Sequence, residues 1–309
     1  MTAIDVHELT KEYGGNRVLD GLGFSLAPGQ VTGFLGPNGS GKSTTLRLLL
    51  GLARPTAGTA LVDGRPYAAL TAPLRRVGAL LDANAAHPRR SARDHLRVLA
   101  ASNGIPAARV GAVLDRVGLT EVAGRRVGTY SLGMRQRLGI AAALLGDPDV
   151  LVLDEPANGL DPEGMTWLRE LLREHAAAGG TALVSSHLTH ETARYADHLL
   201  VIGGGVLLAD QPLDTFLTDR GARLVHFRST DGERLAEVLR SRGHQVLPGE
   251  EGAWRVPGAR PDEIGAIAAA EGLGVLELRA EETGLEDVYL ALTEGTGAHR
   301  GRPSTPTGG

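Results

Sequence analysis

Short apolar runs alternate with longer stretches of helical periodicity in the first two thirds of the chain. The runs VTGFL, VLVLD and TALVSS (residues 31–35, 150–154 and 181–186) have the length and apolar content of buried strands. The segments after residue 41 and from residue 162 repeat their apolar positions every three or four residues, which is typical of a helix. Strands that are apolar on both faces and joined by helices predict a parallel sheet of the α/β class.

Two further patterns add to this predicted sheet. Residues 4–66 are rich in strand patterns and are interrupted by the turn sequences YGGN, APGQ and ARPTAG. Residues 84–146 are rich in Ala, Leu and Arg and have a helical pattern. We therefore expect a β-rich N-terminal part and a helical subdomain around the sheet.

The composition changes near LADQPLDTFLTDRGA, residues 208–222. Beyond it the patterns follow the order β, α, β, β, α, β, which predicts a small α+β module of the ferredoxin-like type. We expect a first domain over residues 3–215 and an accessory domain over residues 220–294. The polar tail, residues 295–309, is expected to be disordered.

Composition excludes several classes of protein. The 309 residues are 42% apolar and 22% charged, as in ordinary globular proteins, and none is cysteine, so disulfides and thiolate sites are excluded. A net charge of −4 argues against nucleic acid as a partner. The sequence has no signal-peptide pattern and no run of 18 apolar residues, so we expect a cytoplasmic protein without a membrane span.

The sequence GPNGSGKS matches the complete phosphate-binding loop (P-loop) pattern. It follows the strand VTGFL and precedes a helix, which is the context that this loop requires. Its glycines allow backbone N–H groups to turn towards phosphates, while the lysine reaches the β- and γ-phosphates and the serine holds Mg²⁺. The expected nucleotide-binding residues here are Gly36, Pro37, Asn38, Gly39, Ser40, Gly41, Lys42, Ser43 and Thr44.

Two adjacent carboxylates end the strand VLVLD. Asp154 is placed to hold Mg²⁺, and Glu155 is the natural general base for a water that attacks a phosphate. The alternative, that they only cap a helix, fits less well because Pro156 follows and a P-loop precedes them. Together these parts predict an NTPase.

A second anion site is expected at the start of YSLGMRQRLGIAAALL. Ser131 occupies the N-cap position of a helical pattern and Gly133 lies in its first turn. This stretch resembles the signature motif of ATP-binding-cassette (ABC) proteins, and it stands just ahead of Asp154 and Glu155, where that motif belongs. The resemblance covers about residues 3–215.

The resemblance implies an ABC cassette of the P-loop NTPase class. In that family two cassettes pack head to tail, and the signature helix of one contacts the γ-phosphate of ATP held by the other. It further implies that Tyr13 stacks on adenine, that Asp161 lies at the dimer seam, and that His187 contacts the γ-phosphate as a catalytic group. ATP and Mg²⁺ are the implied cofactors.

Three positions depart from the common family pattern. Leu132 and Met134 replace a glycine and a glutamine of the signature motif, and Asp82 stands where a glutamine is usual. Asp82 can still hold Mg²⁺ through water, so the resemblance implies altered coupling to the partner and retained ATPase activity.

These departures resemble bacterial drug- and antibiotic-exporter ATPases. That resemblance implies a polytopic permease as partner, a second cassette forming a dimer, and a peripheral location at the cytoplasmic face of the membrane. Export of a lipid or polysaccharide is the main alternative, and an importer ATPase or a soluble ABC ATPase is a further one.

Overall fold

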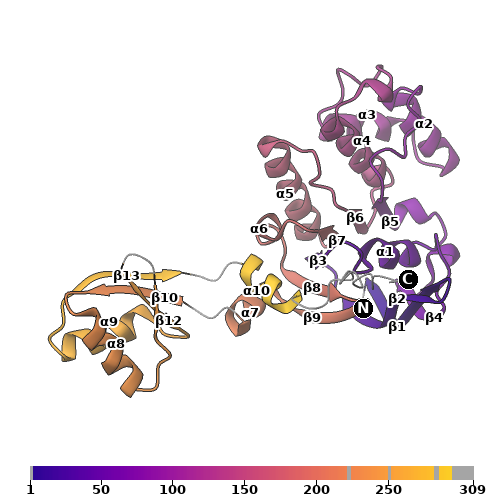
Figure 1. Ribbon diagram of the computed structural model, residues 1–309. Helices are drawn as coiled ribbons and strands as arrows, with labels where there is room; N and C mark the ends of the chain where they lie inside the picture. Colours follow the sequence, from indigo (N-terminus) through magenta and orange to yellow (C-terminus); the bar gives the residue numbers. More distant parts are fainter. Residues whose placement is uncertain (1–2, 221–223, 250–251, 282–284, 294–309) are drawn as a thin grey trace, which may run out of the picture. The chain divides into compact units, whose positions relative to one another are not determined.

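The chain forms two units, shown in the computed structural model of Figure 1. The structure describes residues 3–220, 224–249, 252–281 and 285–293. The first unit includes the residues up to Leu213, and the second comprises Asp214–Leu292. The expected tail, residues 295–309, lies outside the described residues.

A six-stranded mixed sheet is the centre of the first unit. Its order is β5-β6-β7-β3-β8-β9, and every neighbouring pair is parallel except β8 and β9. The middle strands are buried along nearly their whole length, as their apolar sequences predict. The strands are β3 (Val31–Leu35), β5 (Val77–Leu80), β6 (Val150–Asp154), β7 (Thr181–Ser186), β8 (His198–Gly203) and β9 (Val206–Pro212).

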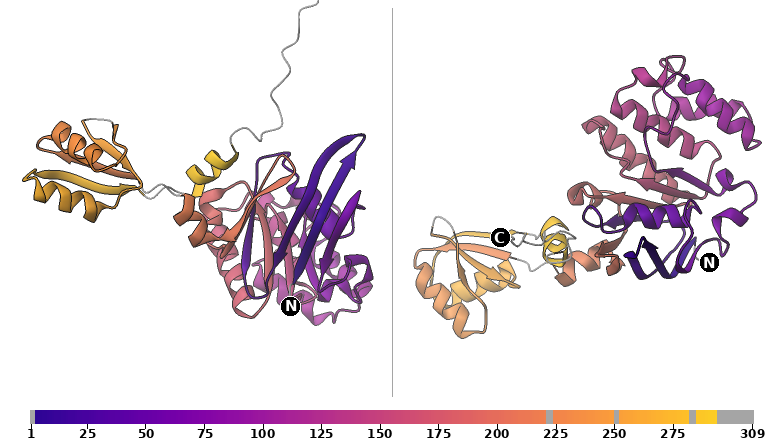
Figure 2. Two further views of the ribbon diagram at one scale, coloured as in Figure 1. Left: turned by 90° about the horizontal axis from the view of Figure 1, so that it is seen from below. Right: turned by 45° about the vertical axis from the view of Figure 1, so that its right-hand side comes forward.

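A three-stranded antiparallel sheet of order β2-β1-β4 packs near the mixed sheet, with helix α1 (Lys42–Leu49) sharing their core (Figure 2). One apolar cluster joins Leu9 and Leu26 of this sheet, Leu46 of α1, and Val152 and Leu183 of the mixed sheet. The predicted β-rich N-terminal part is therefore confirmed. Its strands are β1 (Ile4–Tyr13), β2 (Asn16–Leu26) and β4 (Ala57–Val62).

The predicted helical subdomain is also confirmed. It contains α2 (Ala92–Ser102), α3 (Ala108–Arg116) and α4 (Leu132–Leu144), which pack on one another, and α4 also packs on β5. The N-cap side chain of α2, Ser91, accepts the Asp94 N–H. Helices α5 (Pro162–Ala177) and α6 (Thr189–Thr192) precede and follow β7. Short 3₁₀ turns lie at Tyr67–Ala69, Pro73–Arg75 and Val127–Thr129.

The second unit has the predicted β-α-β-β-α-β order. Its antiparallel sheet has the strand order β11-β12-β10-β13 of a ferredoxin-like module, and α8 and α9 close its core. The elements are β10 (Leu224–Ser229), α8 (Gly232–Ser241), β11 (Leu247–Pro248), β12 (Trp254–Pro257), α9 (Pro261–Ala270) and β13 (Val275–Glu281). Helices α7 (Leu213–Arg220) and α10 (Leu285–Thr293) flank this module in the sequence. Across the described residues, no helix combines the length and apolar character needed to cross a bilayer.

Each unit contains one of the two tryptophans, Trp167 in α5 and Trp254 in β12, so their fluorescence can report on the units separately. Phe227 is fully buried in the core of the second unit. In a Trp167→Phe background, we expect Phe227→Ala to destabilise this unit by about 3–5 kcal/mol, because it removes a buried ring and leaves a cavity. Urea unfolding followed by Trp254 emission measures this loss. Val275→Ala, at a 38% exposed position, is the matched control, and an unchanged midpoint for Phe227→Ala would contradict the assigned core.

Candidate functional site

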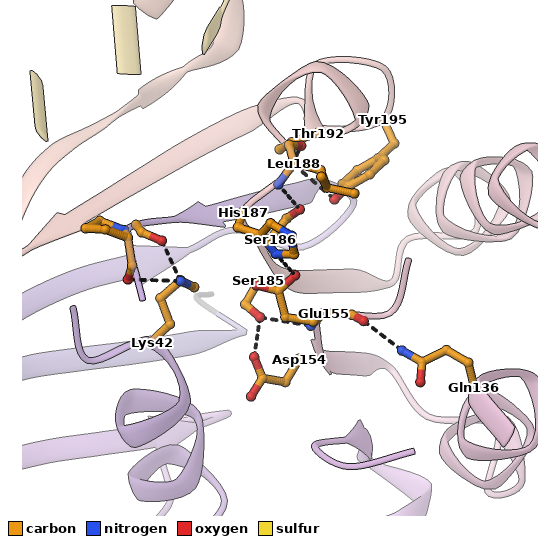
Figure 3. A network of polar contacts seen from close by, with 12 residues as sticks. Lys42, Gln136, Asp154, Glu155, Ser185, Ser186, His187, Leu188, Thr192 and Tyr195 are labelled. Atoms are coloured by element: carbon orange, nitrogen blue, oxygen red, sulfur yellow. Dashed lines mark hydrogen bonds and ion pairs between the residues drawn. The ribbon is translucent and has the colours of Figure 1, made fainter. Parts of the chain in front are cut away.

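The candidate site lies at the carboxyl ends of three adjacent strands, β6, β7 and β3. Because parallel strands end at the same edge of a sheet, the segments that follow them lie together there. The P-loop follows β3, the carboxylate pair ends β6, and His187 follows β7. Figure 3 shows Lys42, the first residue of the helix after the P-loop, together with Asp154 of β6 and Ser185 of β7.

The backbone of the P-loop requires glycine at specific positions. Gly39 and Gly41 have φ values of +81° and +111°, in the left-handed region that side chains disfavour. A Cβ atom at Gly36 would lie 2.5 Å from the Ile202 carbonyl oxygen. Helix α1 begins directly afterwards, and its N-cap residue Gly41 provides no side-chain hydrogen bond. The loop and the first turn of α1 therefore present backbone N–H groups for a phosphate.

Lys42 is buried, and its Nζ donates hydrogen bonds to the carbonyl oxygens of Gly36 and Pro37. Burial lowers the pKa of Lys42, an effect partly opposed by the negative charges of Glu155 and Asp154. Lys42 is thus a desolvated cation held at the loop, facing two carboxylates. The ammonium group suits an anionic phosphate, whereas the two carboxylates would need a cation such as Mg²⁺ between them and that phosphate.

Asp154 and Glu155 are fixed by Ser185 of the neighbouring strand. The Ser185 hydroxyl donates to the Asp154 carboxylate, and the same oxygen accepts the Glu155 N–H at 3.0 Å. Ser185 is fully buried and pairs with Asp154 in the β6–β7 register. The Asp154 carboxylate and the Glu155 main chain are therefore oriented by the sheet itself.

Glu155 combines an unusual backbone with a direct side-chain partner. Its φ is +50°, and a non-glycine residue in this region costs on the order of 1–2 kcal/mol. Its Oε2 lies 2.7 Å from Nδ1 of His187 (Figure 3). An ionised carboxylate can only accept, so Nδ1 carries the proton of this hydrogen bond. Strained residues held by many contacts occur at functional sites, which supports Glu155 as the reactive group.

A cavity of about 630 Å³ opens between these groups. It is large enough for a small-molecule ligand. Most of the predicted loop, metal and base residues border it together: Pro37, Asn38, Gly39, Gly41, Lys42, Ser43, Thr44, Asp82, Asp154 and Glu155.

Several predicted residues are not part of the cavity lining. Tyr13 is 49% exposed on β1, with Lys11 Nζ 4.6 Å from the centre of its ring. The lining includes Val18 of β2, which the sequence analysis did not select. Gly36 and Ser40 belong to the P-loop but do not line the cavity, and His187 contacts the lining residue Glu155.

The start of α4 is arranged as the sequence predicts. Ser131 is the N-cap, and its hydroxyl accepts the Met134 N–H at 3.2 Å. A Cβ at Gly133 would lie 2.7 Å from the Gly159 carbonyl oxygen, so the first turn approaches the loop after β6 closely. Neither Ser131 nor Gly133 lines the cavity of its own chain, whereas the 44% exposed Leu132 does.

Other cavity residues had no predicted role, although Gln136 lies within the signature stretch YSLGMRQRLGIAAALL. Gln136 of α4 and Asn158 after β6 border the cavity, as do Leu81 and Ala83 beside Asp82. Gln136 is a buried amide on an otherwise apolar helix face, and this polar residue in a helical pattern is the signal that could have revealed it.

The residues present fit a magnesium ion bound together with a nucleotide. Magnesium is usually held by one or two carboxylates plus substrate phosphates rather than by a full protein cage. The described residues contain no cluster of three or more histidine, aspartate or glutamate side chains suited to a metal. Ser43, Asp154 and Asp82 border the same cavity and would share the ion with phosphate oxygens. When bound, the ion would neutralise phosphate charge.

Comparisons with known proteins agree with this geometry. A family model described as ABC transporter matches residues 19–158, and a model described as a domain of unknown function matches residues 222–286. The bacitracin transport ATP-binding protein BcrA of Bacillus licheniformis is 35% identical over 95% of this chain and 98% of its own length. A Nod factor export ATP-binding protein I of Burkholderia orbicola is 36% identical over 94% of this chain and 96% of its own length.

Two further similarities are limited to part of the chain. The lantibiotic transport ATP-binding protein SrtF of Streptococcus pyogenes is 35% identical over 68% of this chain and 91% of its own length. A solved structure of an ATP-binding subunit of an ABC transporter superimposes with a TM-score of 0.65 at 28% identity, covering 71% of this chain and 93% of that one. The ABC cassette fold of the first unit is thereby confirmed.

Removing the Lys42 ammonium tests its role at the site. We expect Lys42→Ala to weaken ATP binding by about 10-fold to 100-fold, because hydrogen bonds to charged groups contribute about 1.5–3 kcal/mol each. Titration with a fluorescent ATP analogue measures the affinity. Arg47→Ala removes one exposed positive charge from the same helix and is the control. Equal affinity of Lys42→Ala and the parent would exclude Lys42 as a phosphate ligand.

Proposed function

This chain belongs to the family of ABC transporter ATP-binding proteins, and on that premise we propose that it hydrolyses ATP to drive export of a drug- or antibiotic-like compound through a separate membrane subunit. The observation that carries the chemistry is the convergence of Lys42, Asp154 and Glu155 on one cavity, with His187 bonded to Glu155. The chain would work as a peripheral protein at the cytoplasmic face of the membrane.

The proposed reaction uses Glu155 as the general base. Its Oε2 is engaged by His187, which leaves Oε1 to accept a proton from a water molecule. The water oxygen forms a bond to the γ-phosphorus while the bond between this phosphorus and the β–γ bridging oxygen breaks, giving ADP and phosphate. Lys42 stabilises the negative charge on the β- and γ-phosphates.

A second cassette completes the proposed site. Ser131 and Gly133, at the start of α4, would bind an anion, and neither residue borders the cavity of its own chain. In a head-to-tail homodimer, Ser131 and Gly133 of each chain would contact the γ-phosphate of the ATP bound by the other chain. Asp161 caps α5 and comes two residues after Gly159, which lies against Gly133. Asp161 is proposed to lie at the dimer seam. Hydrolysis would remove the bridging phosphate and allow the dimer to open.

The exported substrate is proposed from the relatives. Proteins named for bacitracin transport align with nearly the whole chain, including the second unit, and a protein named for lantibiotic transport aligns with the cassette. Relatives named for Nod factor export align equally well, so export of a compound of that class is the second candidate.

An apolar groove of about 450 Å³ supports the proposed membrane partner. Leu52 and Leu99 border the groove, and residues 81–83 border both the groove and the nucleotide cavity. A cytoplasmic segment of the permease seated in this groove would contact the same chain segment that faces ATP. Such shared contact is what coupling between hydrolysis and transport requires.

The role of Glu155 is tested by Glu155→Gln, which keeps the side-chain volume and removes the base. We expect hydrolysis to slow by roughly 10²–10⁴-fold while ATP affinity stays within about threefold. Phosphate release and nucleotide titration measure the two quantities. Glu163→Gln, at an exposed residue in the first turn of α5, serves as the control. Hydrolysis at the parent rate would exclude Glu155 as the base.

The proposed binding to a membrane permease is tested by affinity capture. Tagged Glu155→Gln protein is captured from detergent-solubilised native membranes with ATP present. We expect a polytopic membrane protein in near-equal amount, and we expect its loss with the added substitution Leu52→Asp, because Leu52 is 67% exposed on the groove. Val206→Asp, at a 39% exposed site outside the groove lining, is the control. Recovery of only ribosomal or DNA-associated proteins would exclude transport.

A further inference from the structure

The amide side chain of Gln136 has a defined partner in the catalytic loop. Gln136 lies in α4, is only 4% exposed, and its Nε2 donates to the backbone oxygen of Glu155 at 2.7 Å (Figure 3). A buried amide is retained with a partner because an unsatisfied one is unfavourable. Here the partner is the backbone carbonyl of Glu155, the proposed general base.

Hydrogen bonds on both sides hold the Glu155 peptide groups. The Glu155 N–H donates to the backbone oxygen and the hydroxyl of Ser185, at 3.2 and 3.0 Å. The Glu155 carbonyl accepts from the Asn158 N–H at 3.2 Å in addition to Gln136. With φ at +50°, this conformation persists only because its surroundings fix it. Gln136 is the only side chain among the described residues that donates to this carbonyl.

Helix α4 contacts the same loop a second time, at its first turn. Gly133 approaches the Gly159 carbonyl so closely that a Cβ would meet it at 2.7 Å, and Leu132 packs against Gly159. The two ends of the loop 155–159 are therefore attached to the first two turns of α4. A displacement of the helix start would move the loop that carries Glu155.

We propose that Gln136 is a positioning residue that holds Glu155 for attack by water and links its geometry to the start of α4. This inference rests on the proposed function, in which Glu155 is the base and Ser131 contacts a phosphate bound by the second chain. Contact between Ser131 and that phosphate would fix the position of the start of α4. Through its hydrogen bond, Gln136 would then fix the position of Glu155 in its own chain. Hydrolysis at one site would then depend on ATP at the other.

The first test replaces the amide by a thioether of similar length, Gln136→Met, in the purified full-length chain. We expect kcat to fall on the order of 10-fold to 100-fold, since a small misplacement of a reacting group has this effect. The Kd for ATP should stay within about twofold. In the Glu155→Gln background the same substitution should cause no further fall, because Gln136 acts through the Glu155 carboxylate.

Gln211→Met is the matched control. Gln211 is partly buried in β9, outside the cavity lining, and its Nε2 has no hydrogen-bond partner within the described residues. Its substitution should leave kcat unchanged. The control separates loss of the Gln136 hydrogen bond from the general effect of removing a buried amide.

The second test uses the pH profile of Gln136→Glu and does not depend on the methionine variant folding. Protonated, the new carboxyl group can donate to the Glu155 carbonyl; ionised, it cannot. Burial raises the pKa of a carboxyl group, so the protonated form extends to higher pH than for an exposed glutamate. We expect the kcat of Gln136→Glu, divided by the parent kcat at the same pH, to fall as pH rises through that pKa.

Each outcome separates the inference from the proposed function. The positioning role would be overturned if Gln136→Met left kcat unchanged or lowered it equally in the Glu155→Gln background. It would also be overturned if Gln136→Met lowered the affinity for ATP, or if the ratio of the Gln136→Glu kcat to the parent kcat did not change with pH. If the parent chain hydrolyses no ATP, or if Glu155→Gln retains the parent rate, the proposed function fails instead.

Discussion

The proposed chemistry of this site depends on holding Glu155 in a left-handed backbone conformation at the end of β6. The conformation is unfavourable for a residue with a side chain, and four hydrogen bonds to its backbone groups maintain it. Their partners come from β7, from the loop after β6, and from α4. The residue whose carboxylate contacts His187 is therefore held by both the sheet and the helical subdomain. The fold thus fixes the proposed general base through its main chain.

The elements most predictable from sequence were those with strong local signals. The P-loop spacing, the apolar strands β3, β6 and β7, and the Ser131 cap each depend on a few neighbouring residues, and the structure contains all of them where the patterns predicted. The alternation of patterns after residue 222 likewise predicted the second unit's strand and helix order. Local periodicity and turn chemistry are sufficient for such elements.

The remaining site residues depend on contacts between distant segments. Gln136 meets Glu155 across 19 positions of sequence, and Val18 of β2 borders a cavity formed mainly by segments after residue 36. No periodicity encodes such approaches, since they follow from how α4 and the antiparallel sheet pack on the mixed sheet. The prediction of Tyr13 as an adenine contact remains a prediction, because its ring lies outside the cavity lining beside Lys11.

The nucleotide cavity and the apolar groove share a wall, which supports the proposed coupling between hydrolysis and transport. Residues 81–83 separate the nucleotide cavity from the apolar groove and border both. Asp82 is the charged member of this segment, and its Oδ1 accepts the Asn84 N–H at 2.8 Å, which ties the carboxylate to its own turn. A change of phosphate charge near Asp82 alters the electrostatic energy of that turn, and the turn is also a wall of the groove. Under the proposed function, an acid at this position would make the groove responsive to the charge state of the nucleotide.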